Sequence, residues 1–213
     1  MDGAPEHVAR AVLDRYGTTF AEEAGIDLED NPAPLFQLLV LAELLSARIG
    51  SGIAVAAAVE LNKADWATPK AMHDARRPAV IAALGRAGYR RYDERTATQL
   101  HEMAELVLGH YGGDLRGLTG EADGDVERAA TLLQEVKGIG PTGAAVFLRE
   151  VQAVWPWVRP YLDDRARAGA RRVSLPDDGQ GLADLVRPGD LARFAAGLVR
   201  ISRLPKSQDP LGG

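Results

Sequence analysis

Apolar residues recur about every three or four positions along most of this chain, which is the spacing of one face of an α-helix. The stretch Leu35–Arg48 is apolar nearly all round, so we expect it to be the buried central helix of its region. The sequence has no alternating apolar and polar runs of the kind that strands need. The pattern therefore predicts an all-α protein, with helices over residues 5–24 (bent or ended at Gly17), 35–48, 53–61, 72–75, 78–84, 89–108, 126–136, 141–154, 163–172 and 188–204.

The composition is that of an ordinary globular chain. Of its 213 residues, 46% are hydrophobic and 26% are charged, enough for one large helical domain or two small lobes. No apolar run reaches the roughly 18 residues of a membrane span, and the N-terminus lacks the basic and apolar regions of a signal peptide. The sequence has no cysteine, which excludes a disulfide, a thiol nucleophile and an iron–sulfur cluster held by cysteines. We therefore expect a cytoplasmic protein.

The net charge of −5 argues against a dedicated nucleic-acid-binding protein, because such proteins usually carry a basic domain. Binding depends on the local field, however, and not on the summed charge. A group of arginines surrounds the pair Asp163 and Asp164. Its members are Arg159, Arg165, Arg167, Arg171 and Arg172. We expect any duplex binding to be weaker and more sensitive to salt than that of a strongly basic protein.

The segment Val136–Thr142 joins two predicted helices through a pair of glycines. Gly138 and Gly140 favour a tight hairpin, because glycine tolerates positive φ and allows close approach of another group. Pro141 suits the first turn of the helix that follows. The free N–H groups and the positive dipole end of that helix are suited to binding a phosphate. The alternative is a plain tight turn between two helices.

Several features in order along the chain resemble the helix-hairpin-helix (HhH-GPD) DNA glycosylase superfamily, which contains endonuclease III and the adenine and alkylpurine glycosylases. They are the hairpin Lys137-Gly138-Ile139-Gly140, the turn Trp155-Pro156, an Asp that opens the next helix, and the helix end Leu44-Leu45-Ser46-Ala47-Arg48, similar to the "LLSAQ" of endonuclease III. The resemblance covers about residues 32–173. It implies two helical lobes, formed by residues 1–49 with 156–213 and by residues 50–155, and a base that flips from duplex DNA into a cleft between them.

The resemblance assigns the catalytic carboxylate to Asp163. A carboxylate beside the sugar stabilises the oxocarbenium-like charge that develops when an N-glycosidic bond breaks, and it can orient or deprotonate a water. Because the chain from Pro156 to Asp163 is about two residues longer than in endonuclease III, Asp164 is a rival for this role. The alternative interpretation is that Asp163 caps the helix that it starts.

Members of the superfamily that also cut the strand carry a Lys two positions after the second glycine of the hairpin. Thr142 stands at that position here, and Thr cannot form a Schiff base. Lys137 lies on the other side of the hairpin and is a poor substitute on geometry. We therefore expect no lyase activity by the endonuclease III mechanism. Thr142 either hydrogen-bonds within the site or satisfies backbone donors in the first helical turn.

The resemblance also implies the contacts with DNA. Backbone N–H groups of Gly138, Ile139 and Gly140 would hold one phosphate, with further contacts from Lys137, Thr142 and Arg165. Arg48 replaces the Gln of endonuclease III that fills the gap left by the flipped base; otherwise it complements the helix dipole. A monovalent cation, Na⁺ or K⁺, would bind the carbonyl oxygens of Gln134, Val136 and Ile139.

Aromatic residues allow two interpretations. Trp155 and Trp157 either stack on a base or anchor a turn, and a Trp beside a Pro favours the anchor. Tyr89 and Tyr92 either touch the DNA backbone or stand at a solvated helix start, which we favour.

Two hypotheses follow. The first is a monofunctional DNA glycosylase of base excision repair, a monomer that hydrolyses the bond of a damaged or mispaired base in double-stranded DNA. The second is a catalytically degenerate relative that binds damaged or bent DNA, or a protein partner, without glycosylase or lyase activity.

Overall fold

The structure, a computed structural model, describes residues 4–212. Every regular element in this range is a helix, which confirms the all-α prediction. No helix in the described range is both long and apolar enough to cross a membrane. The α-helices are α1 (Pro5–Tyr16), α2 (Phe20–Glu23), α3 (Pro32–Ser46), α4 (Ser51–Lys63), α5 (Pro69–Asp74), α6 (Arg77–Arg86), α7 (Asp93–Tyr111), α8 (Gly117–Ala122), α9 (Val126–Glu135), α10 (Pro141–Val151), α11 (Asp164–Arg172), α12 (Gly179–Ala183) and α13 (Leu191–Arg203), and the short 3-10 helices are η1 (Pro156–Val158) and η2 (Pro188–Asp190).

The chain divides into two compact units. Residues 1–20 and 148–213 form one, here called the terminal unit, and residues 21–147 form the other, here called the middle unit. The sequence placed the boundaries at residues 49/50 and 155/156. The observed boundaries lie at 20/21 and 147/148, so both differ. The first differs because α3 packs on α4 and therefore belongs with the helices that follow it.

The terminal unit is built around α13, which packs against both α1 and α11. Its predicted apolar face is buried, with Phe194, Leu198 and Ile201 fully inaccessible. The contact with α11 is close: a Cβ added to Gly169 would lie 1.9 Å from the Leu198 carbonyl oxygen, so only glycine fits there. This packing fixes α11. Asp163 is the N-cap of this helix and Asp164 is its first residue.

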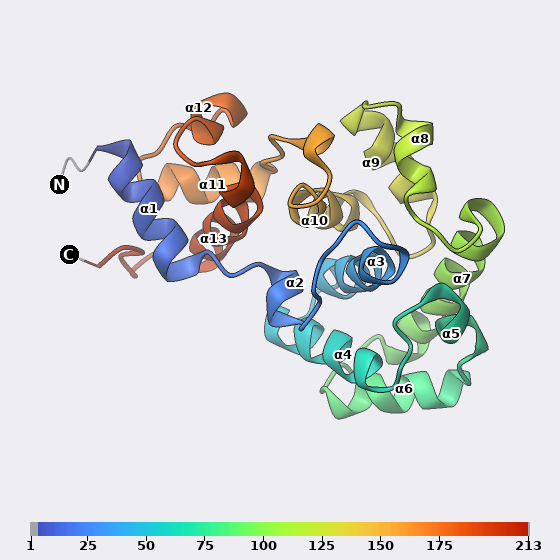
Figure 1. Cartoon of the computed structure of the whole chain (residues 1–213). Helices are drawn as coiled ribbons and strands as arrows, with labels where there is room; N and C mark the ends of the chain where they lie inside the picture. The colour runs from blue at the N-terminus through green and yellow to red at the C-terminus, as the bar shows by residue number, and fades with distance from the viewer. Residues whose placement is uncertain (1–3, 213) are drawn as a thin grey trace. The chain divides into compact units, whose positions relative to one another are not determined.

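The middle unit has α3 at its centre, as the continuous apolar pattern predicted. Leu35, Leu38, Leu41 and Leu44 are fully buried, and Figure 1 shows α3 among the other helices of this unit. The end of α3 lies beside the segment that joins α9 to α10, since a Cβ added to Gly138 would contact the Glu43 side chain. The central helix thus supports the predicted hairpin.

Several predicted helix ends differ from the observed ones, and the short helices α8 and α12 were not predicted. Residues 5–24 form α1 and α2, and α1 ends at the C-cap Gly17, as the sequence predicted. The helix expected from residue 89 begins at Asp93. Tyr89 precedes that helix and is 1% exposed, so its interpretation as part of a solvated helix start is wrong. The Tyr89 hydroxyl group forms a hydrogen bond with Thr96 Oγ1 at 3.3 Å, which satisfies the buried phenol.

Candidate functional site

Two helices and a tight turn form around the glycine pair. The Asp125 carboxylate caps α9 by accepting the N–H groups of Glu127 and Arg128, at 2.9 and 3.1 Å. In the turn, the Ile139 N–H donates to the Val136 carbonyl oxygen at 3.0 Å. The side chains of Val136 and Ile139 are buried, so they anchor the turn to the core of the middle unit.

Gly138 is required in this turn for two separate reasons. Its φ of +94° lies in a region that residues with a Cβ rarely adopt. In addition, a Cβ at this position would lie 2.7 Å from the carboxyl carbon of Glu43. The backbone of the turn therefore rests directly on the side chain of a residue in α3.

We predict that Gly138→Ala destabilises the protein through both effects. The unfavourable φ costs about 1–2 kcal/mol, and the carboxyl end of the Glu43 side chain must shift to make room for the added Cβ. Gly120→Ala is the matched control, because Gly120 lies in α8 with no atom within 4 Å of the added Cβ. Urea unfolding of both variants measures the difference. Equal stabilities would show that the turn does not depend on Gly138.

The start of α10 is accessible, as phosphate binding requires. Lys137, Pro141 and Thr142 are exposed. The first N–H groups of a helix have no acceptor within the helix, and they coincide with the positive end of its dipole. The N–H group of Ile139 differs from the other predicted phosphate donors, because it already donates to the Val136 carbonyl oxygen within the turn. The role of the Gly138 and Gly140 N–H groups in holding a phosphate stays a prediction.

The predicted cation ligands are carbonyl oxygens, which suit Na⁺ or K⁺. Gln134 lies in the last turn of α9 and Ile139 lies in the hairpin, where carbonyl groups no longer receive helical N–H partners. The Val136 carbonyl already accepts the Ile139 N–H and has one further lone pair. The donor chemistry therefore fits a monovalent cation, and its binding stays a prediction.

Asp163 lies in the terminal unit, at the N-cap of α11. One carboxylate oxygen accepts the Ala166 N–H at 2.9 Å, so the residue caps this helix as the alternative interpretation expected. The other oxygen pairs with Arg149 Nη1 at 2.5 Å. The side chains of Arg149 and Asp163 are 2% and 11% exposed, so this is a nearly buried ion pair. The sequence analysis did not identify Arg149.

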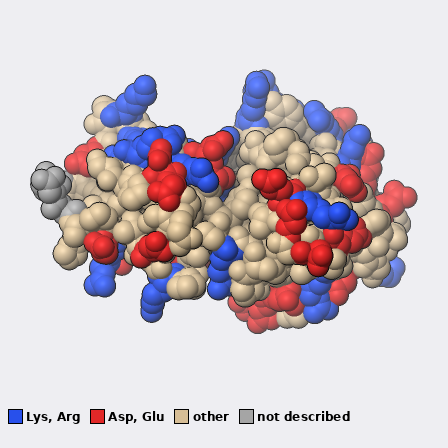
Figure 2. Space-filling model, turned by 90° about the horizontal axis from the view of Figure 1, so that it is seen from above, with Lys and Arg blue, Asp and Glu red and all other residues tan. Residues whose placement is uncertain are grey.

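The neighbours of Asp163 are more exposed. Asp164 opens α11 and Arg165 follows it, and both are exposed. Burial, and after it the charges of Arg165 and Arg149, lower the pKa of Arg203, so several guanidinium groups act on the same region of the terminal unit. On the face shown in Figure 2, basic side chains gather in separate groups that lie next to acidic ones.

We predict unequal costs for the two aspartates. Asp163→Asn leaves the Arg149 guanidinium without its counter-charge, and breaking one partner of a buried pair costs about 3 kcal/mol. Asp164→Asn removes only a favourable charge at a helix start, worth about 0.3–1 kcal/mol. Thermal and urea unfolding of the two isosteric variants compare them. A cost for Asp164→Asn as large as that of Asp163→Asn would contradict the assignment of the ion pair.

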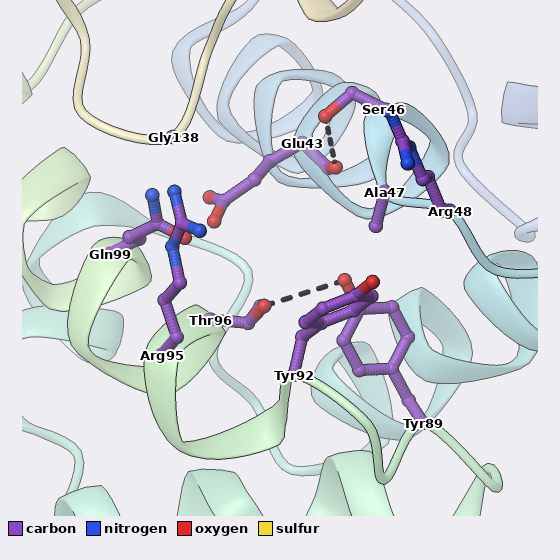
Figure 3. A pocket seen from close by; sticks show the side chains of 10 residues that line it. All are labelled: Glu43, Ser46, Ala47, Arg48, Tyr89, Tyr92, Arg95, Thr96, Gln99 and Gly138. Atoms are coloured by element: carbon purple, nitrogen blue, oxygen red, sulfur yellow. Dashed lines mark hydrogen bonds between the residues drawn. The ribbon is translucent and has the colours of Figure 1, made fainter.

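A pocket in the middle unit brings Arg48 and Gly138 together (Figure 3). Its cavity is about 270 Å³. At its wall lies Glu43, which is 4% exposed and whose two carboxylate oxygens have no hydrogen-bond partner in the described chain. The remaining lining residues are Ser46, Ala47, Tyr89, Tyr92, Arg95, Thr96 and Gln99.

Glu43 was missed in the sequence, although a signal was present. It is the one charged residue of α3, a helix that is otherwise apolar or neutral. Burial raises its pKa well above the ordinary value of 4.5; the charge of Arg95 lowers it and that of Glu102 raises it further. Burial therefore favours the protonated, uncharged form of this side chain.

We predict that Glu43→Leu stabilises the protein, since an unsatisfied buried polar group costs about 1–3 kcal/mol. The gain grows with pH. Above the ordinary value of 4.5 the unfolded chain loses the proton that folded Glu43 keeps, so wild-type stability falls by about 1.4 kcal/mol per pH unit until the raised pKa is reached. Urea unfolding at about pH 5 and about pH 8 tests this. The same gain at both pH values would mean that folded Glu43 is ionised.

The tryptophans behave as a turn anchor. Trp155 and Trp157 stack with ring centroids 5.6 Å apart and planes at 21°. Trp155 is 2% exposed, which leaves it no face for a base. This agrees with the interpretation that we favoured.

The comparisons with known proteins find similar solved structures. No protein-family model matches the sequence. No curated protein matches it either. Among solved structures, the chain is similar to a trapped covalent intermediate of endonuclease III with DNA, an estranged-adenine complex, with a TM-score of 0.48 and 15% identity over 91% of this chain and 84% of that chain.

Proposed function

We propose that this protein is a monofunctional DNA glycosylase that hydrolyses the N-glycosidic bond of a damaged or mispaired base flipped from duplex DNA. The observation that carries the proposal is the hairpin around Gly138. Its backbone N–H groups and the exposed start of α10 offer an anion site to a DNA phosphate. Lys137, next to Gly138 and exposed, adds a positive charge.

The chemistry assigned to Asp163 needs only a carboxylate and a water. As the bond from C1′ to the base breaks, its electron pair leaves with the base and positive charge develops on the sugar. The carboxylate stabilises this charge and orients a water, whose oxygen then bonds to C1′ while its proton passes to the carboxylate and from there to the departing base. Because Thr142 has no amine, no Schiff base forms and the strand stays intact.

A second candidate function is binding of damaged or bent DNA without catalysis. The ion pair between Asp163 and Arg149 favours it, since a paired carboxylate stabilises a nearby cation less than a free one does. Both oxygens of Asp163 already have partners. For hydrolysis, the carboxylate would have to act on the sugar while it keeps the guanidinium as a neighbour.

We predict product from at least one duplex in a panel that carries uracil or thymine opposite guanine, oxidised pyrimidines, oxidised guanine pairs, or alkylated purines. Strand cleavage should be seen only after alkali, which breaks the abasic site that a water-using glycosylase leaves. Asp163→Asn should lose turnover and keep duplex binding, whereas Asp164→Asn should keep both.

The controls separate the two candidate functions. Cleavage without alkali would contradict the role given to Thr142. Under our proposal, Thr142→Lys supplies the missing amine and the variant cleaves the strand without alkali. If wild type already cleaves without alkali, this variant should cleave no more than wild type does. Binding to the duplexes with no product on any of them would overturn the glycosylase and favour the non-catalytic binder.

A further inference from the structure

The terminal unit contains a buried glutamine that the proposed reaction leaves unused. Gln152 directly follows α10, and it is 0% exposed. Burying an amide costs free energy unless its N–H groups and its oxygen find partners. An apolar side chain of similar size would fill the same space without that cost. The hydrogen bonds of Gln152 therefore indicate what this side chain does.

The amide of Gln152 joins two separate stretches of backbone. Its Nε2 group donates to the Tyr161 carbonyl oxygen at 2.8 Å and to the Arg149 carbonyl oxygen at 2.9 Å. Its Oε1 atom accepts the Tyr161 N–H at 3.0 Å. One of the joined residues, Arg149, carries the guanidinium that pairs with Asp163. The other, Tyr161, precedes Asp163 by two positions.

The segment that precedes Asp163 needs such partners because it has no regular structure. It lies between η1 and α11, outside any helix. Side chains hold its backbone in place of a helical ladder. Gln152 binds both polar backbone groups of Tyr161, and Arg167 Nε donates to the Leu162 carbonyl oxygen at 3.1 Å. The path of the chain into Asp163 is therefore set by these side chains.

The backbone of Gln152 is itself held by Arg159. The Arg159 guanidinium donates to the carbonyl oxygens of Gln152 and Ala153, at 2.5 and 2.6 Å. These carbonyl groups follow the end of α10, where no helical N–H reaches them. Since both its backbone and its side chain are held, Gln152 is a rigid link between the end of α10 and the segment before Asp163.

We propose that Gln152 is a positioning residue, which holds the Asp163 carboxylate in place through the backbones of Arg149 and Tyr161. Its effect on catalysis rests on the proposed function. A carboxylate acts on a sugar cation and a water only from a fixed place, and a misplacement of about 1 Å can lower a rate about 100-fold. The cap and the ion pair hold Asp163 directly, whereas Gln152 holds the backbone on which both depend.

The test removes the amide and keeps its bulk. Gln152→Met has a side chain of similar size that forms none of the three hydrogen bonds. Val12→Ala is the matched control. Val12 is fully buried in α1 of the same unit, so its truncation lowers stability through a cavity and leaves the hydrogen bonds of Gln152 intact. Urea unfolding gives the stability that each variant loses.

The first measurement needs no catalytic activity. The Ala166 N–H donates to Asp163 Oδ1 at 2.9 Å, so its hydrogen exchange reports whether the carboxylate keeps its place. Gln152→Met should speed this exchange about fivefold, as expected for the loss of a helix cap. Val12→Ala should leave it unchanged, because the opening that exposes the Ala166 N–H is local to the start of α11.

The second measurement separates binding from chemistry, on whichever duplex of the panel wild type acts on. Gln152→Met should bind this duplex as tightly as wild type and lower the single-turnover rate about 10- to 100-fold. Val12→Ala should keep both values. If Gln152 only contributed stability, Gln152→Met would behave as Val12→Ala does.

The two measurements distinguish a failure of this inference from a failure of the glycosylase. Equal exchange of the Ala166 N–H in wild type and Gln152→Met overturns the positioning role. On an active wild type, an unchanged turnover rate in Gln152→Met, or an equal loss of rate in Val12→Ala, also overturns it. Faster exchange with no product on any duplex supports the placement of the carboxylate by Gln152 and overturns the glycosylase alone.

Discussion

The middle unit depends on one contact, between the buried carboxyl group of Glu43 and the backbone of Gly138. Glu43 is the one charged residue of the largely buried helix α3, and burial raises the pKa of its carboxyl group well above the ordinary value of 4.5. Gly138 lies against it with a φ of +94°, so the shape of the hairpin and the chemistry of the pocket are coupled. A side chain at position 138 would disturb both at once. This coupling explains why the turn needs glycine even beyond its backbone conformation.

Along the chain, helix α10 connects the hairpin, which would bind a phosphate, to the residue that holds Asp163. It begins at the hairpin in the middle unit and ends in the terminal unit, where it carries Arg149. Arg149 holds Asp163 at the start of α11, and α11 is held in turn by its close contact with α13. The carboxylate is therefore rigidly placed by a cap and an ion pair. A rigidly placed carboxylate is an advantage for catalysis. The positive charge of Arg149, however, weakens the stabilisation that this carboxylate gives to a sugar cation.

The features that the sequence predicted correctly are local. Helical spacing, the prolines at helix starts and the glycine pair determine their own conformations over a few residues, so the helices, the turn and the N-cap at Asp163 were predictable. Apart from the short helices α8 and α12, the features that were missed join distant segments. No local pattern pairs Arg149 with Asp163 or brings Glu43 under Gly138. Tyr89 illustrates the same limit, because its burial depends on packing against other helices and not on its own polar neighbours.

The central claim is that burial raises the pKa of Glu43 in the folded protein, and the side-chain carboxyl carbon reports this directly. Carbon-13 NMR of the labelled protein across about pH 4 to about pH 9, with Glu43→Gln to assign the signal, follows its titration. The account predicts that this carbon titrates well above the ordinary glutamate value of 4.5. Titration at that ordinary value would show an ionised Glu43, and the account of the hairpin and its pocket would be wrong.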